Sequence, residues 1–184
     1  MPPFAYDGAM HPALVLTVIG RDRPGLVEQL ARLIADHGGN WLESRMNRLG
    51  GEFAGILRLT VPSDRESALR QALAALGNAG LNVQIRSDDV PAPVPTRVVQ
   101  LELVGQDRPG IVRQIASAWA SRGINVEELV TECVSAAMSG ETLFKATAKV
   151  ALPAGVDLPS LRADLDRIAN DLLVDISLTS LENA

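Results

Sequence analysis

The sequence contains one cysteine, Cys133, and two histidines, His11 and His37, among its 184 residues. A single cysteine excludes a disulfide bond within the chain, and this usage is typical of a reducing compartment, so we expect a cytoplasmic protein. Neither histidine belongs to a His/Cys/Asp/Glu set with metal-ligand spacing, and Cys133 has no histidine or lysine near it in sequence. We therefore expect no enzyme activity, no metal and no cofactor.

Lysine and aromatic residues are also scarce. Aromatics make up 3% of the chain, the 17 basic residues are nearly all arginines spread singly, and the net charge is −5. Direct binding of nucleic acid needs a basic stripe that neutralises phosphates, and none is visible. No apolar run has the length of a membrane span, and the first dozen residues lack the basic start and apolar stretch of a signal peptide. We expect neither nucleic-acid nor membrane binding.

The chain instead carries one sequence pattern twice. The letters GRDRPGLV at residues 20–27 return as GQDRPGIV at residues 105–112, and Asn40 returns as Asn125 at the same offset of 85 residues. A unit of about half the chain has thus been duplicated. We expect a flexible lead, a first domain, an extended proline-rich linker and a second domain, at residues 1–12, 13–90, 91–96 and 97–184.

The period of the apolar pattern changes in the same order in both halves. In the first half, a β-branched run indicates a buried strand, a helical stripe begins with Pro24 as first helical residue, and two strand-like stretches flank Gly50-Gly51 as in a hairpin. A second helical stripe and a last strand follow. The predicted strands are 13–19, 41–49, 53–61 and 81–85, then 98–104, 126–134, 143–152 and 173–178, and the second hairpin carries six extra residues around 135–141.

A β-α-β-β-α-β order with right-handed crossovers forms a four-stranded antiparallel sheet with both helices on one face. The predicted class is therefore α+β, with two ferredoxin-like domains. The other face of each sheet and an edge strand remain to be covered. We expect the two domains to cover each other as a pseudo-symmetric pair within the chain, and further association of this pair into a homodimer is left open.

The repeated turn is the candidate binding site. The first amide N–H groups of a helix have no internal acceptor, and together with the helix dipole they attract a carboxylate. Glycine at positions 25 and 110 lets a ligand approach the backbone, and Asp22 and Asp107 are placed to pair with an ammonium group. We expect Asn40 and Asn125, at the next strand starts, to converge on the same end of the sheet. Such a site fits a small amino acid.

A purely structural interpretation competes with this one. Asp-Arg-Pro-Gly is also a good turn sequence, because Asp bonds its own backbone, Pro fixes φ and Gly relieves crowding. Arg23 and Arg108 are better explained as solvated or as salt-bridged to an acidic neighbour than as ligand clamps. The module would then serve only interaction or oligomerisation, without a ligand.

The repeated pattern resembles a known family. A strand, then Gly-x-Asp-Arg-Pro-Gly-[Leu/Ile]-Val, an amphipathic helix and an Asn at the next strand start are similar to the ACT domain, a small-molecule regulatory module. The tandem arrangement without a catalytic domain, with NWLESR from residue 40 and NVEELV from residue 125, resembles the ACT-domain repressors of glycine cleavage genes. Such repressors act through a transcriptional activator protein, and glycine is thought to weaken that association.

The resemblance also implies site residues. In ACT domains the ligand commonly lies by the first strand–helix loop, often where two domains meet. Carried over by position, the implied ligand-binding residues are Asp22, Arg23, Pro24, Gly25, Leu26 and Asn40, with Asp107, Arg108, Pro109, Gly110, Ile111 and Asn125. Glycine or serine is the favoured ligand, and a transcriptional activator is the implied protein partner.

Overall fold

A computed structural model describes residues 11–88, 97–135 and 141–180. The chain divides into two compact units, residues 1–91 and 92–184. The predicted linker at 91–96, residues 1–10 of the predicted lead and most of the predicted insertion at 135–141 lie outside the described residues.

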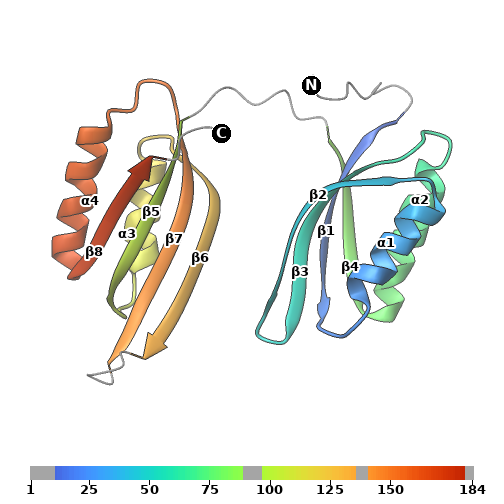
Figure 1. Cartoon of the computed structure of the whole chain (residues 1–184), viewed down its shortest axis with the longest axis horizontal. Coiled ribbons are helices and arrows are strands. Elements are labelled where there is room, and N and C mark those ends of the chain that lie inside the picture. Colours follow the sequence, from blue (N-terminus) through green and yellow to red (C-terminus); the bar gives the residue numbers. More distant parts are fainter. Residues whose placement is uncertain (1–10, 89–96, 136–140, 181–184) are drawn as a thin grey trace. The chain divides into compact units, whose positions relative to one another are not determined.

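The first unit follows the β-α-β-β-α-β order. Its sheet has the strand order β2-β3-β1-β4, and all neighbours are antiparallel. Both helices lie on one face of the sheet (Figure 1). The elements are β1 (Ala13–Arg21), α1 (Leu26–Asp36), β2 (Asn40–Leu49), β3 (Glu52–Thr60), α2 (Glu66–Ala75), a short 3-10 helix (Leu76–Ala79) and β4 (Leu81–Ser87).

The second unit repeats this architecture. Its sheet order is β6-β7-β5-β8, which is the order of the first sheet element by element, and its two helices again share one face (Figure 1). The elements are β5 (Arg97–Gln106), α3 (Ile111–Ala120), β6 (Asn125–Ser135), β7 (Thr142–Leu152), α4 (Leu158–Leu172) and β8 (Val174–Ser180). The predicted α+β class with two ferredoxin-like units is confirmed.

Each unit has its own apolar core between sheet and helices. Alternate residues of β1 and the inner face of α1 are buried, as in Leu16 and Leu30, which are both fully buried. In the second unit Leu101 and Ile115 occupy the equivalent positions. Burial of aliphatic side chains on the inner faces is the main stabilising contribution in both cores.

One edge strand of each sheet, β2 in the first unit and β6 in the second, has the same irregularity. The pairing of β2 with β3 shifts between Trp41 and Glu43, and the pairing of β6 with β7 shifts between Val126 and Glu128. Each shift is a β-bulge, in which one extra residue bends the edge strand. The bulges are 85 residues apart, so this backbone feature was duplicated with the unit.

Candidate functional site

The repeated turn connects the first strand of each unit to its first helix. Gly25 and Gly110 are the N-cap residues of α1 and α3, with φ of 91° and 98° in the left-handed region that favours glycine. Their carbonyl oxygens accept the first helical hydrogen bonds, from Gln29 N at 2.9 Å and from Gln114 N at 3.0 Å. The expectation that Pro24 starts the helix is wrong, because the left-handed glycine after it interrupts the helical backbone.

Both glycine caps are open among the residues that the structure describes. Apart from its chain neighbours, a Cβ added at Gly25 or Gly110 would meet none of their atoms within 4 Å, and none of their side chains caps α1 or α3. In α4, by contrast, the Asp157 side chain accepts a hydrogen bond from Ser160 N at 3.0 Å. Since α2 also lacks a side-chain cap, the open glycine, rather than the missing cap, distinguishes the two repeated turns.

Asp22 has a partner within its own unit. Its carboxylate lies 2.7 Å from Nε of Arg48 on β2, and its N–H donates to the carbonyl of Gly51 at 3.0 Å. The N–H of Asp107 donates in the same way to Thr142 O at 3.0 Å. These contacts attach the turn to the hairpin beside it. Arg48 was not found from the sequence, because it lies in the next strand pair and no local motif marks it.

The two turn arginines bond neutral oxygen atoms. Arg23 donates to Gln29 Oε1 at 3.3 Å and to the carbonyl of Ala79 at 3.4 Å, and Arg108 donates to Gln106 Oε1 at 3.0 Å. The acidic neighbour anticipated from the sequence does not appear in these contacts. Both side chains are exposed and flank the turn.

The two asparagines lie at the opposite end of the sheet from the turn. Asn40 pairs with Thr60, which pairs with Ala13 at the start of β1, whereas Asp22 follows Arg21 at its end. The two ends of β1 are eight residue steps apart, which is about 27 Å at 3.4 Å per residue. Asn125 pairs with Ala151 and is equally far from Asp107. The expectation that the asparagines and the turn of one unit share an end of the sheet is therefore wrong.

The reason is the path of the chain. Each first helix returns along the sheet, so the second strand begins where the first strand began and not where it ended. Each unit brings together the Asp-Arg-Pro-Gly residues and the first helical residue, Leu26 or Ile111. It does not bring its asparagine to them.

The two turns also differ in what lies beside them. Ile111 lines an apolar cavity of about 160 Å³ together with Trp119, Val126, Ala148 and other residues of α3 and the sheet. By strand register, Trp41 and Leu57 of the first unit stand where Val126 and Ala148 stand in the second. Smaller side chains thus leave space under α3, along the helix from Ile111 to Trp119.

Two side chains considered as candidates for catalysis, His37 and Cys133, lie at a helix end and on a strand. His37 is the C-cap of α1, and its Nδ1 lies 2.8 Å from Leu33 O, which confirms the predicted place at a helix end. Cys133 is an exposed thiol on β6. Within residues 11–88, 97–135 and 141–180, no three or more His, Cys, Asp or Glu side chains gather as metal ligands. No helix in these ranges is long and apolar enough to cross a membrane.

Comparison with known proteins places these features in a family context. Residues 13–86 match the ACT domain family. The chain is 29% identical over 121 residues to the glycine cleavage system transcriptional repressors of Escherichia coli (strain K12) and Shigella flexneri. The match covers 64% of this chain and 63% of each repressor, so the chain spans less than two thirds of the length of these curated relatives.

Two solved structures are similar to this chain over nearly its whole length. A crystal structure of an unknown protein from Galdieria sulphuraria has a TM-score of 0.81 and 31% identity, covering 94% of this chain and 99% of that one. The crystal structure of a candidate glycine cleavage system transcriptional repressor has a TM-score of 0.67 and 22% identity, with the same coverage. The second likeness shows a common fold.

Proposed function

We propose that this chain, a tandem ACT-domain protein resembling the glycine cleavage system transcriptional repressor, is a regulatory protein that responds to a small amino acid. The observation that carries the proposal is the duplicated turn, in which a left-handed glycine without a covering side chain precedes a helix without a side-chain cap. The two turns agree in sequence and in φ, although the side chains around them differ.

The geometry supports a carboxylate at the first amides of α1 and α3. Those N–H groups point away from the helix body toward the turn, and the helix dipole adds a partial positive charge there. Asp107 is the better partner for a ligand ammonium group, because Asp22 already pairs with Arg48. Glycine and serine are favoured, since they present both charges with little else. We restrict the proposed site to the turn residues and leave Asn40 and Asn125 outside it.

The proposed regulation passes through a protein partner. The arginines are dispersed and the net charge is −5, so the chain lacks the basic footprint that supports direct binding of DNA. We propose that it represses glycine cleavage genes by contacting a transcriptional activator, without catalysis and without a cofactor. A ligand regulates such contact only if it binds two states of the protein with different affinity.

One observation favours a second function. The Asp22–Arg48 pair and the Asp22 N–H bond to Gly51 give the first turn a structural purpose. In that case the chain would be an interaction or oligomerisation module whose turns bind nothing.

Amino-acid binding is expected to stabilise the protein against heat. At about 100 times its Kd, a ligand raises the free energy of unfolding by about 2.7 kcal/mol, and Tm then rises by several degrees. Differential scanning fluorimetry with the twenty amino acids tests this, with glycine and serine expected to give the largest shifts. A full panel without a shift at millimolar concentration would contradict the sensor and favour the interaction module.

The same thermal-shift measurement on glycine variants tests whether the two turns are the binding site. Gly25→Asn and Gly110→Asn keep a residue that tolerates the left-handed backbone but place a side chain over the amides. We expect the double variant to fold and to lose the shift. Gly155→Asn is the matched control, because Gly155 has φ of 91° and equally open surroundings in another loop. A double variant that keeps the full shift would place the ligand elsewhere.

The partner proposal is tested by a pull-down from native cell extract. The bound fraction of a transcriptional activator is expected to fall when glycine is added. The Gly25→Asn/Gly110→Asn variant is expected to retain the activator whether or not glycine is present. Capture of no activator under either condition would contradict the proposed route to gene control.

A further inference from the structure

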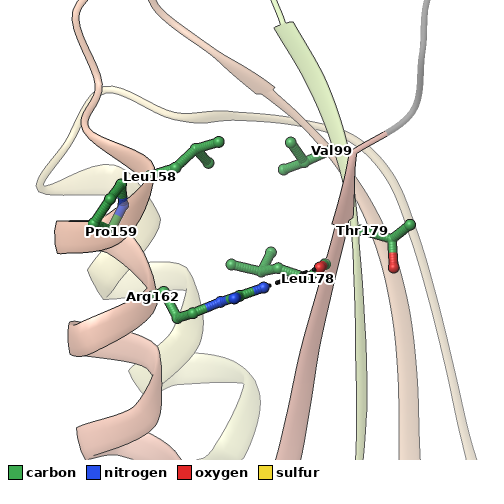
Figure 2. A pocket seen from close by; sticks show the side chains of 6 residues that line it. All are labelled: Val99, Leu158, Pro159, Arg162, Leu178 and Thr179. Carbon is green, nitrogen blue, oxygen red and sulfur yellow. Dashed lines mark hydrogen bonds between the residues drawn. The ribbon is translucent and has the colours of Figure 1, made fainter.

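A pocket of about 330 Å³ lies between α4 and β8 in the second unit. Figure 2 shows the side chains of Leu158, Val99 and Leu178 around a hollow, and Arg162 extending from α4 toward β8 on one side of it. The Thr179 side chain points away from α4, as strand alternation requires. The walls are therefore mainly aliphatic, with one cation.

Arg162 is only partly used by the protein. One terminal nitrogen donates to the carbonyl oxygen of Leu178 at 3.3 Å (Figure 2). A guanidinium carries five N–H donors, and within the part of the chain that the structure describes Arg162 belongs to no ion pair. Donors thus remain for an anion beside the apolar walls.

The equivalent arginine of the first unit has a different partner. The buried leucines Leu69 and Leu73 of α2 correspond to Leu161 and Leu165 of α4, which places Arg70 at the position of Arg162. Arg70 donates from Nε to Glu66 Oε1 at 2.7 Å, and the two side chains are 32% and 27% exposed.

Leu158 occupies the position of Glu66 in the second unit. The arginine thus stands at the same place in both units, but only the first unit has an intrahelical carboxylate beside it, and the second has an apolar wall there. In the first unit the Glu66 carboxylate pairs with the arginine. In the second unit the equivalent position beside Arg162 has no carboxylate and borders a pocket.

The carboxylate one helical turn after Arg162 does not compensate. Asp166 lies one turn beyond Arg162 and borders a neighbouring depression with it, but the two side chains form no ion pair within 4.0 Å. An acid C-terminal to its basic partner is also the less favourable order at this spacing on a helix. Asp166 is therefore no substitute for the missing Glu.

We propose that this pocket binds a small carboxylate that carries an apolar chain. The carboxylate pairs with the Arg162 guanidinium, which matches its fork geometry, and the chain packs against Val99, Leu158 and Leu178. The volume is at the lower end of small-molecule sites. The pocket is separate from the proposed amino-acid site, because Val99 lies near the start of β5 and Asp107 follows its end.

Three probes separate the contribution of the ligand's carboxylate from that of its alkyl chain. Hexanoate has both groups, acetate has the carboxylate without a long alkyl chain, and 1-hexanol has the alkyl chain without the carboxylate. Isothermal titration calorimetry on the full chain is expected to give a Kd for hexanoate at least tenfold lower than for either control. Equal affinities for hexanoate and 1-hexanol, or no heat from hexanoate up to tens of millimolar, would overturn the proposal.

Matched variants then test the residues. Arg162→Gln is expected to weaken hexanoate binding to the level of 1-hexanol, whereas Arg70→Gln, the equivalent change in the first unit, leaves it unchanged. Leu158→Glu restores the ion pair of the first unit and is expected to abolish binding. Gly110→Asn leaves hexanoate binding intact, which separates this site from the amino-acid response. An equal loss in Arg70→Gln and Arg162→Gln would refute the assignment even if Leu158→Glu failed to fold.

Discussion

Leu30→Ala is expected to lower the free energy of unfolding of the first unit by about 2–5 kcal/mol. Leu30 is fully buried on the inner face of α1, within the cluster that joins this helix to β1 and β3. Truncation removes buried methyl groups and leaves a cavity that the neighbouring side chains only partly fill. Since a unit of about 80 residues has a stability of roughly 4–12 kcal/mol, a loss of this size removes a large part of it.

Val27→Ala is the matched control on the same helix. Val27 is 47% exposed, so its truncation is expected to change the free energy of unfolding by less than about 0.5 kcal/mol. Urea unfolding followed by Trp41 fluorescence in a Trp119→Phe background reports on the first unit for both variants. Similar losses at Leu30 and Val27 would contradict the assigned burial.

Gly20→Ala is expected to destabilise the first unit by about 3 kcal/mol or more, above the usual range for overpacking. A Cβ at Gly20 would overlap the carbonyl oxygen of Gly80 and lie 3.1 Å from Leu81 Cα. Both are backbone atoms of the adjoining strand and its turn, so no side chain can rotate aside. Relief requires β1 and β4 to separate, which weakens their ladder.

Gly77→Ala provides the contrast within the same segment. A Cβ there would meet only Asn82 Oδ1, at an ordinary distance of 3.7 Å, and Gly77 lies in the short 3-10 helix. Its replacement is expected to be neutral or to stabilise by up to about 1 kcal/mol, because alanine restricts the unfolded chain. Gly20→Ala with the stability of Gly77→Ala would contradict the close approach of β1 to β4.

The periodic part of the fold could be predicted from the sequence. The apolar, β-branched run of β1 and the leucine stripe of α4 depend only on neighbouring residues, and both elements form where expected. Leu173 is an exception. The sequence pattern places it in the last strand, but in the structure it is the C-cap of α4, in a left-handed conformation with φ of 56°. Glycine is the usual residue in this conformation at the end of a helix.

The candidate site was harder to predict because it depends on register and on distant residues. The turn glycines are marked locally by the repeat. The separation of Asn40 from the turn follows only from strand pairing, and the pairing of Asp22 with Arg48 requires knowledge of where the hairpin folds. Likewise, no local motif marks Arg162. Its difference from Arg70 becomes visible only when α4 is aligned with α2, which places Leu158 at the position of Glu66.

The paired bulges in β2 and β6 have a consequence for aggregation. Each of these strands forms one edge of its sheet, with β4 or β8 at the other edge, and a regular open edge is a template on which another chain can add a strand. The extra residue is Leu42 in the first bulge and Glu127 in the second. The bulge is therefore present in both units although the residue that forms it differs. A strand adding to either edge would lose its regular ladder at the bulge. Duplication thus copied, with each sheet, a barrier against open-ended polymerisation.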